Sequence, residues 1–236
     1  MALNQDLTRL FGSIARNYDL ANHTLSLGLD YYWRRVLARS LRQAPPGLFL
    51  DIAAGTCDVS VLLTKSYAGR KVLALDPCLP MLRTGLRKIS AGIMPVAGDA
   101  FCLPLPEHSV SAITLSFGLR NMRPRPAALG EMFRVLVPGG RLSVLEFGGT
   151  KQNPGTGINP WLAAYRFYLF KALPRIGGMI SGQRKAYEYL AQSIAGFPGR
   201  EELAAEMLAA GFERVMCRSM SGGIVYLHCA DKKRLE

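Results

Sequence analysis

The sequence predicts an α/β protein with a mostly parallel, seven-stranded sheet whose last strand is antiparallel. Two observations lead to this prediction. Short apolar segments alternate with helix-length amphipathic segments between residues 48 and 147, which is typical of parallel strands joined by helices. Two more strand-like segments, 212–218 and 223–229, meet across Ser221-Gly222-Gly223, and this hairpin makes the last strand antiparallel.

The most informative stretch is residues 48–58. It starts as an apolar run that reaches Asp51, continues through small residues with Gly55 and Thr56, and arrives at Asp58 before an apolar-periodic segment. Such a run is typical of a buried parallel strand, and Asp is a favoured helix N-cap. We therefore expect a strand, a tight turn and a helix start, where a ligand can lie against bare backbone.

A second apolar strand, 71–76, ends in Asp76, where a carboxylate is placed to hold the two hydroxyls of a ribose. Dinucleotide-binding turns need glycine at three positions, which here are Ala53, Gly55 and Asp58. A carboxylate at the third position would repel a pyrophosphate. The turn therefore favours a nucleoside without phosphates, such as S-adenosylmethionine, and a purely structural turn with two incidental acids is the alternative.

Further loops are expected at the same edge of the sheet, where ligands bind in such folds. Asp99 and Ala100 follow one strand and suit the amino edge of an adenine, although Asp99 alone would also fit a loop acid or helix cap. Ser116 ends the next strand. The predicted core elements are strands 48–52, 71–76, 93–97, 110–116 and 141–147, and helices 58–67, 79–89 and 125–137.

Before the core, residues 4–43 are expected to be helical in two pieces, separated by a polar and aromatic stretch, 16–23, that is rich in poor helix formers. This part either packs on the sheet or forms a lid that places Tyr18 and Asp19 over the cofactor pocket. With a lid, His23 would be a pocket residue, although a lone histidine is more often structural.

Length and composition favour one cytoplasmic domain. The 236 residues are 49% hydrophobic, and the five cysteines show no Cys-x-x-Cys pair, which argues against a disulfide framework or a metal site. We expect neither a signal peptide nor a membrane span, because no cationic start with an apolar core and no run of 18 uncharged apolar residues occurs. The expected parts are a helical lid (1–45), a cofactor-binding core (46–150), a basic aromatic insertion (151–200) and a C-terminal helix and hairpin (201–236).

The insertion carries seven Lys/Arg against one acid, about half of the net charge of +12. Its apolar, aromatic block starts at Trp161 and is followed by Pro174. The block packs as a core helix, lines an apolar mouth, or lies in a membrane interface with its basic residues near lipid headgroups. Nucleic acid is disfavoured, because the aromatic residues form one block and do not alternate with basic ones.

Two specific motifs, Phe117-Gly118-Leu119-Arg120-Asn121 and Glu146-Phe147, point to a family. With them the chain resembles the ubiquinone/menaquinone biosynthesis C-methyltransferases, which are class I S-adenosylmethionine-dependent enzymes with a Rossmann-like fold. The similarity covers nearly the whole length. Less specific matches include Tyr18-Asp19, Leu50-Asp51, Gly55-Thr56, Asp76, Gly98-Asp99-Ala100, Pro138-Gly139-Gly140 and Phe197-Pro198.

The resemblance implies methylation of a ring carbon of demethylmenaquinol or of a methoxy-polyprenyl-benzoquinol, in menaquinone or ubiquinone biosynthesis. Its cofactor positions fall on Thr56, Asp76, Asp99, Ala100 and Ser116, and Asp51 and Gly55 of the first turn join this expected set. One residue departs from the family pattern. Cys57 stands where the family usually has glycine, so its Cβ is expected to clash at a close backbone approach or to force a costly φ.

The chemistry directs attention to Arg120 and Asn121. A ring carbon attacks a sulfonium methyl only when the ring is electron-rich, so the expected substrate is the reduced quinol. Arginine is too basic to accept a proton, but it can stabilise a developing phenolate or hold a water, with Asn121 orienting it. An Arg-Asn pair that only closes a loop is the alternative.

Other functions stay open at this point. A non-catalytic methyltransferase-like domain that binds a quinone or a protein is one, and a methyltransferase of another small molecule is the other. We also expect weak peripheral association with an anionic membrane surface, on the inner face of the membrane. The sequence does not decide between a monomer and a homo-oligomer, nor which quinone is used.

Overall fold

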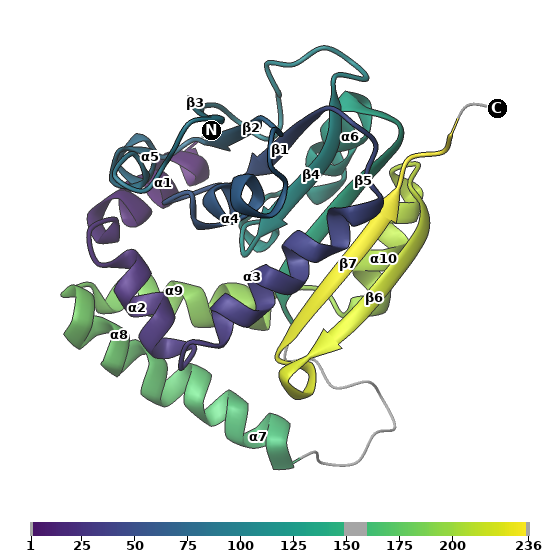
Figure 1. The fold of residues 1–236 in the computed structure, drawn as a ribbon. Coiled ribbons are helices and arrows are strands. Elements are labelled where there is room, and N and C mark those ends of the chain that lie inside the picture. The colour runs from purple at the N-terminus through teal and green to yellow at the C-terminus, as the bar shows by residue number, and fades with distance from the viewer. Residues whose placement is uncertain (1, 149–159, 235–236) are drawn as a thin grey trace.

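The computed structural model describes residues 2–148 and 160–234 and is built around one seven-stranded sheet (Figure 1). The strand order is β3-β2-β1-β4-β5-β7-β6. Strands β1 to β5 pair in parallel, and β7 pairs antiparallel with both β5 and β6, as the sequence predicts. The strands are β1 (Leu48–Ile52), β2 (Val72–Asp76), β3 (Ile93–Ala97), β4 (Val110–Ser116), β5 (Leu136–Phe147), β6 (Glu213–Met220) and β7 (Val225–Asp231).

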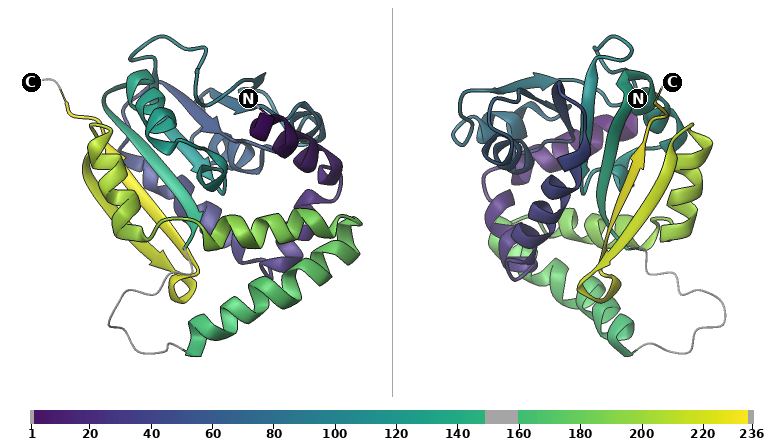
Figure 2. Two further views of the ribbon diagram at one scale, coloured as in Figure 1. Left: turned by 180° about the vertical axis from the view of Figure 1, so that it is seen from behind. Right: turned by 45° about the vertical axis from the view of Figure 1, so that its right-hand side comes forward.

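Helices cover both faces of the sheet, and a further helical layer lies across one end of it (Figures 1 and 2). The α-helices are α1 (Ala2–Ile14), α2 (Tyr18–Leu25), α3 (Leu29–Ser40), α4 (Asp58–Ser66), α5 (Leu79–Gly85), α6 (Arg125–Val135), α7 (Pro160–Phe167), α8 (Leu173–Ser181), α9 (Arg184–Ala195) and α10 (Arg200–Ala209). Short 3₁₀ turns occur at η1 (Leu41–Gln43), η2 (Leu119–Asn121) and η4 (Ser221–Gly223), and η3 (Tyr168–Ala172) is a π-helical segment.

The alternation of side chains along β1 explains how one short strand serves two cores. Leu50 and Ile52 are fully buried against α6 and α10 on one face. Phe49 points to the other face and joins the cluster formed by α3 and α4. Because successive side chains of a strand face opposite sides, Asp51 must point to the α4 side.

The third layer consists of α1, α2 and the helices from α7 to α9. Its own apolar cluster includes Ile14, Ala21, Leu169 and Ile194, all buried. Helix α2 packs against α8, and α8 packs against α9, so the N-terminal helices and the insertion meet although they are far apart in sequence. Figure 1 shows α2, α7, α8 and α9 below the strands and α1 beside α5, and the left view of Figure 2 shows α6 and α10 on the opposite face from α3.

The structure corrects several predicted boundaries. The N-terminal part has three helices and not two, because the stretch expected to be irregular forms α2 from Tyr18 onward. Helix α5 ends at Gly85, four residues before the predicted end, where a Cβ would lie 2.9 Å from the Thr56 carbonyl oxygen. Strand β5 begins at Leu136, earlier than predicted, since the Pro138-Gly139-Gly140 segment continues the strand through an irregularity in its pairing with β4.

The insertion is more helical than its proline suggests. Helix continues from α7 through the π-helical segment η3 into α8, with Pro174 near the start of α8. Proline has no N–H to donate, and the wider π turn lies where that hydrogen bond would be made. Helix α9 lies within the insertion, which was expected to be helical, although its own limits were not predicted.

Candidate active site

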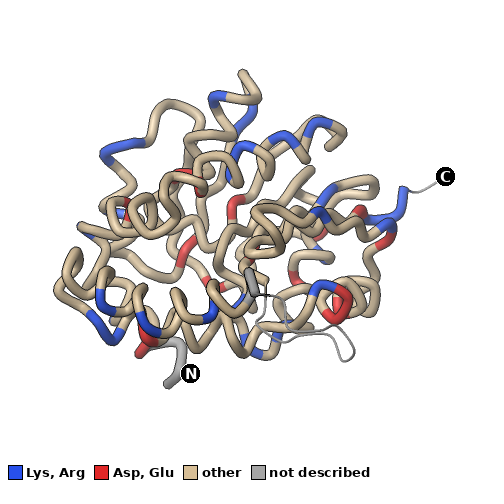
Figure 3. The backbone as a smooth tube through the Cα atoms, turned by 90° about the horizontal axis from the view of Figure 1, so that it is seen from below, with Lys and Arg blue, Asp and Glu red and all other residues tan. Residues whose placement is uncertain are grey.

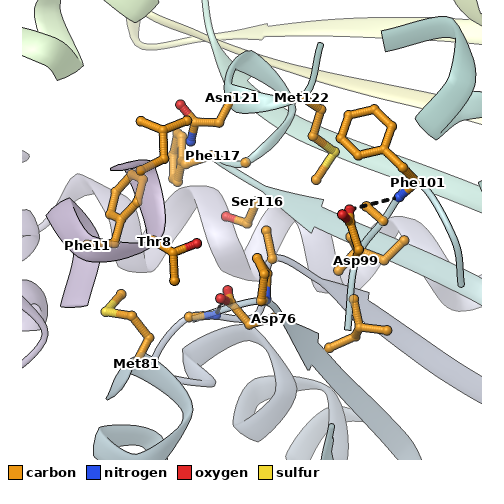
Figure 4. A pocket seen from close by; sticks show the side chains of 18 of the residues that line it. Thr8, Phe11, Asp76, Met81, Asp99, Phe101, Ser116, Phe117, Asn121 and Met122 are labelled. Carbon is orange, nitrogen blue, oxygen red and sulfur yellow. Dashed lines mark hydrogen bonds between the residues drawn. The ribbon is translucent and has the colours of Figure 1, made fainter. Parts of the chain in front are cut away.

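A small pocket lies at the carboxyl ends of β1, β2, β3 and β4, under helix α1. Its volume is about 100 Å³. Figure 4 shows the oxygen atoms of Asp76, Ser116 and Thr8 turned toward its centre. The lining residues are Leu7, Thr8, Phe11, Tyr18, Ile52, Ala53, Gly55, Leu75, Asp76, Pro77, Met81, Asp99, Ala100, Phe101, Ser116, Phe117, Gly118, Asn121 and Met122.

Asp76 is the acid at the end of β2, and the backbone holds it in one orientation. The N–H of Gly55 donates to Asp76 Oδ2 at 2.8 Å, and the N–H of Cys78 donates to Oδ1 at 2.7 Å. Burial raises the pKa of Asp76, and these two hydrogen bonds oppose the rise. The carboxylate therefore bridges the turn after β1 and the turn after β2, and it faces the pocket.

The turn after β1 follows an unusual backbone path. Ala53, Gly55 and Cys57 all have positive φ, at 55°, 55° and 65°. A Cβ on Gly118 would lie 2.6 Å from the Cβ of Ala53, so the loop after β4 approaches this turn closely. Positive φ is costly for residues other than glycine, so the turn stores backbone strain at Ala53 and Cys57.

Cys57 lies away from the pocket, which corrects one half of the sequence expectation. Its side chain is fully buried and packs with Ala74, Leu82 and Ile93 on the α4 side. Burial raises the pKa of the Cys57 thiol to about 12. The expected strained φ is present, but the sulfur is not among the pocket-lining atoms, so the expected clash with a bound cofactor does not arise from its side chain.

The loops after β3 and β4 supply the other polar groups of the pocket. Asp99 Oδ1 accepts a hydrogen bond from the N–H of Phe101 at 3.1 Å, which shapes this loop around Ala100 (Figure 4). The Ser116 hydroxyl is buried and has no hydrogen-bond partner among the described residues. A buried hydroxyl without a partner is costly, so Ser116 is suited to a ligand.

Asp51 and Thr56, both expected at the cofactor, do not line this pocket. Asp51 is 1% exposed, and it accepts hydrogen bonds from Ser60 at 2.6 Å and Thr114 at 2.8 Å. Burial raises the pKa of Asp51 to about 6. The Thr56 hydroxyl points to α2 and donates to Asp19 Oδ1 at 2.5 Å.

A chain of charged contacts joins the N-terminal helices to the turn after β1. Lys88 lies 2.6 Å from Asp19 and 2.5 Å from Asp58, and Arg34 lies 2.8 Å from Asp58. Arg34 continues the chain to Asp30, 2.7 Å away. Through these contacts Asp19 holds α2 against the turn after β1. Asp19 does not line the small pocket, whereas its neighbour Tyr18 does.

His23 lies outside the pocket. Its Nδ1 is 2.7 Å from Asp30, and its ring stacks on Tyr31 with ring centroids 4.3 Å apart. Asp30 also accepts hydrogen bonds from Arg34 and Ser26. These contacts favour the structural role for His23 over a role as acid or base.

A second, larger cavity adjoins the small pocket. It has a volume of about 720 Å³ and shares Phe11, Tyr18 and Phe117 with the small pocket. Most of its lining is aliphatic or aromatic. The lining residues are Phe11, Ile14, Tyr18, Asn22, Thr24, Leu25, Ser26, Leu27, Leu29, Asp30, Trp33, Arg34, Phe117, Arg120, Phe147, Ala164, Tyr165, Tyr168, Leu169, Leu173, Ile176, Ala186, Tyr187, Tyr189, Leu190, Ile194, Ser221 and Ile224.

Arg120 and Asn121 lie where the two spaces meet. Arg120 lines the large cavity, is 5% exposed, and places Nη1 2.9 Å from Glu146 Oε1. Its Nη1 also donates to the Phe117 carbonyl oxygen, while its Nε has no partner among the described residues. Asn121 lines the small pocket and accepts a hydrogen bond from Tyr189 at 2.9 Å.

The aromatic block of the insertion lines the large cavity with Tyr165, Tyr168 and Leu169, which fits the apolar mouth that was one of its expected roles, but other residues of the site were missed. Thr8, Phe11 and Met81 enter the small pocket from α1 and α5, and Phe101 and Met122 enter from loops. Phe101 directly follows the expected Asp99-Ala100 pair and was within reach of the same argument. The cavity residues of α8 and α9 gave no such signal, because their apolar spacing is that of ordinary core helices.

Two surveys of the described part of the chain bear on earlier expectations. No three His, Cys, Asp or Glu residues among 2–148 and 160–234 gather in a group that could hold a metal ion. Within the same residues, no helix combines the length and the apolar character that crossing a membrane requires.

Comparison with known proteins gives concordant results. The model of the ubiE/COQ5 methyltransferase family matches residues 2–232. A demethylmenaquinone methyltransferase of Mycobacterium tuberculosis (strain H37Rv) is 44% identical over 229 residues, which are 97% of this chain and 93% of the relative. The enzyme of the same name from Mycobacterium marinum is 42% identical over 97% of this chain and 94% of its own length.

Solved structures agree on the fold. A SAM-dependent methyltransferase from Thermotoga maritima superposes with a TM-score of 0.67 at 19% identity and covers 95% of this chain and 99% of its own. A SAM-dependent methyltransferase from Aquifex aeolicus gives a TM-score of 0.59 at 16% identity, over 84% of this chain and 88% of its own. The seven-stranded sheet with an antiparallel last strand is therefore the class I methyltransferase fold.

Proposed function

This chain belongs to the ubiE/COQ5 methyltransferase family, and on that premise we propose that it methylates a ring carbon of an isoprenoid quinol with S-adenosylmethionine as the methyl donor. The main support for this proposal is that the small pocket and the large cavity adjoin each other. A small pocket with fixed polar groups opens beside a large apolar cavity, and Arg120 and Asn121 lie between them. The relatives named demethylmenaquinone methyltransferase make demethylmenaquinol the first substrate to test.

The small pocket has the donors and acceptors that an adenosyl cofactor needs. We assign the ribose hydroxyls to Asp76, which the backbone already orients, and the adenine to the loop of Asp99 and Ala100, with Phe101 beside it. The unpartnered Ser116 hydroxyl is the orphaned polar group that supports a ligand here. Gly55 leaves bare backbone for the rest of the cofactor.

We infer that the N-terminal helices act as a lid. The small pocket, at about 100 Å³, is below the several hundred Å³ of typical ligand sites. Leu7, Thr8 and Phe11 of α1 occupy its open side. Cofactor entry therefore requires α1 to move outward, while the contacts from Asp19 to Thr56 and Lys88 hold the lid closed.

The large cavity suits a quinol with an apolar tail. Its volume of about 720 Å³ lies within the range of small-molecule sites, and its walls are mostly aliphatic and aromatic. Phe117 and Phe147 lie near the entrance to the small pocket, with ring centroids 4.6 Å apart, and Arg120 lies over the Phe147 ring. A planar ring bound there would lie next to Arg120, which is buried and paired to Glu146.

The bound cofactor supplies an electrophilic methyl group. Arg120 stabilises the phenolate that forms when a phenolic oxygen loses its proton to solvent, which makes the ring carbon nucleophilic, and Glu146 fixes the guanidinium in place. Asn121, held by Tyr189, orients the ring or a water at the junction. The ring carbon of the phenolate would attack the methyl group, so that a carbon–carbon bond forms as the carbon–sulfur bond of the donor breaks. The ring carbon would then lose its proton to solvent and the phenolic oxygen would regain one, which restores the quinol.

Single-turnover methyl transfer to a short-chain demethylmenaquinol analogue tests the proposal. We expect a methylated product only with S-adenosylmethionine and only under reducing conditions, because the oxidised ring is not a nucleophile. Binding of S-adenosylmethionine without methyl transfer to any quinol would contradict the proposed enzymatic function. It would support a non-catalytic, quinone-binding domain.

We further propose that the protein works as a peripheral protein on the inner face of the membrane, where its lipid substrate resides. The basic insertion supports this, because Arg166, Lys171, Arg175 and Lys185 are exposed and make no salt bridge within the described residues. Flotation with anionic vesicles is expected to show weak binding, and the part of it that comes from these charges should fade with salt.

A further inference from the structure

Two neighbouring segments of the third layer expose large apolar side chains to solvent. Leu27 is 89% exposed, Met179 is 79% and Phe167 is 68%. Surface patches of this kind mark interaction sites more often than chance exposure. We define the apolar rim as Leu20, Leu27 and Leu29 of the α2–α3 region together with Phe167, Phe170 and Met179 of helix 160–181.

The two halves of the apolar rim lie side by side. The Tyr168 hydroxyl donates to the Leu25 carbonyl oxygen at 2.7 Å, and the Asn17 amide reaches the Ile180 carbonyl oxygen at 3.4 Å. These two bonds show that α2 runs antiparallel to helix 160–181. Figure 1 shows the turn between α2 and α3 meeting that helix at the lower edge of the molecule.

The apolar rim also borders the mouth of the large cavity. Leu27 and Leu29 are exposed and at the same time line the cavity, so they stand where it opens to solvent. From the other side, Tyr168, Leu169 and Leu173 of helix 160–181 line the interior. A molecule that passes between α2–α3 and helix 160–181 therefore goes from the apolar rim directly into the cavity.

Charge identifies what covers this face. Residues 160–195 contain five basic residues, all exposed, against one acid, Glu188. Figure 3 views the molecule from below and marks Lys and Arg along the backbone, together with the acids of all layers. Apolar side chains surrounded by cationic ones match the acyl boundary and the anionic headgroups of a bilayer.

We propose that the apolar rim inserts into the surface of an anionic bilayer and that the lipid substrate enters the large cavity there, without passing through water. The route of the substrate rests on the proposed function, whereas the docking surface does not. Insertion transfers Leu27, Phe167 and Met179 from water to acyl chains, so part of the binding persists at high salt.

Vesicle flotation tests the docking surface. The double variant Phe167→Glu/Met179→Glu changes two rim residues that do not line the cavity. The control Leu208→Glu/Met216→Glu makes the same charge change at side chains 54% and 56% exposed on α10 and β6. With phosphatidylglycerol-containing vesicles, the rim variant should bind about tenfold or more weakly, and the control should bind within about twofold of the unaltered protein.

Two outcomes would refute the proposal that the apolar rim docks on a membrane. Equal loss in the rim variant and in the control would mean that only total charge matters. A wild-type dimer by light scattering that the rim variant converts to monomer, with vesicle binding unchanged, would mean that a second copy of the chain covers the rim.

Kinetics test the route. The rim variant should methylate a detergent-free, short-chain quinol analogue at a rate within about twofold of the unaltered protein, and a long-chain quinol embedded in vesicles about tenfold or more slowly. Equal rates on the vesicle substrate would refute the route. If the unaltered protein methylates neither quinol, the proposed function fails, yet the flotation result still decides the docking surface.

Discussion

The guanidinium of Arg120 and the carboxylate of Glu146 form a buried ion pair, with Nη1 and Oε1 2.9 Å apart. Glu146 also accepts hydrogen bonds from the Arg120 N–H and the Phe147 N–H, at 3.2 Å and 2.9 Å. Both side chains are at most 5% exposed. The pair connects the loop after β4 to the end of β5 and holds the guanidinium beside the large cavity.

Replacing Arg120 by Ala should lower kcat by roughly 10²–10³, the effect of losing one donor to a developing oxyanion. Affinity for S-adenosylmethionine should change little, because Arg120 lines the large cavity and not the small pocket. Arg120→Lys should be little better, since a single ammonium cannot reproduce the planar fork. Single-turnover transfer and cofactor titration measure the two effects, and near-normal turnover by Arg120→Ala would remove Arg120 from the mechanism.

The ion pair requires a stability control for this variant. Removing one partner of a buried pair costs about 3–5 kcal/mol, because the remaining charge is left unpaired. Arg120→Leu/Glu146→Gln removes both charges and should unfold at a higher temperature than Arg120→Leu alone. It should nevertheless stay as inactive as the single variant. Activity that returns together with stability would show that Arg120 acts only on folding.

Replacing Asp76 by Ala should weaken cofactor binding by about 1.5–3 kcal/mol, as expected for a hydrogen bond to a charged group. The matched control is Asp51→Asn, at the other acid near a strand end, which does not line the pocket and should bind the cofactor normally. Calorimetric titration compares them, and NAD should not compete. Normal binding by Asp76→Ala, or competition by NAD, would refute the assigned site.

Asp51 should make stability depend on pH. Burial raises the pKa of Asp51 from 3.8 to about 6. The folded protein thus holds this proton more tightly than the unfolded chain, so the free energy of unfolding falls as the pH rises from about 4 to about 6, and the cost is fully present above that window. Asp51→Asn should be more stable than the unaltered protein by about 3 kcal/mol at about pH 8 and about equal near pH 4. Thermal unfolding across this range checks it, and a difference that does not vary with pH would contradict it.

Cys57 should neither affect the affinity for the cofactor nor react with thiol reagents in the folded protein. Its side chain is buried in an apolar cluster beside the turn after β1, and burial raises the pKa of its thiol to about 12. Thiol reagents should therefore leave Cys57 unmodified in the folded protein. Cys102 is exposed and should react first, whereas Cys217, whose pKa is raised to about 11, should react more slowly. Cys57→Gly should keep cofactor affinity within about twofold, since glycine accepts the positive φ. A large gain in affinity would show that Cys57 distorts the turn.

The sequence alone determined the layered α/β fold, because strand and helix periodicity are properties of short segments. The limits of β1, β3 and β4, the hairpin and the position of the first turn could be read from apolar runs and glycines, whereas the start of β5 could not. The family could also be read, from Phe117-Gly118-Leu119-Arg120-Asn121 and Glu146-Phe147, which the family comparison bears out.

The tertiary structure decided which residues meet. Asp51 and Asp76 look alike in sequence as acids at the ends of apolar strands, but Asp51 faces α4 and bonds to Ser60, whereas the backbone after β1 turns Asp76 to the pocket. The large cavity exists because α2 and helix 160–181 pack together, with Tyr168 bonded to the Leu25 carbonyl 143 residues away. Local spacing specifies the face that each element buries, but it carries no information on which distant face covers it.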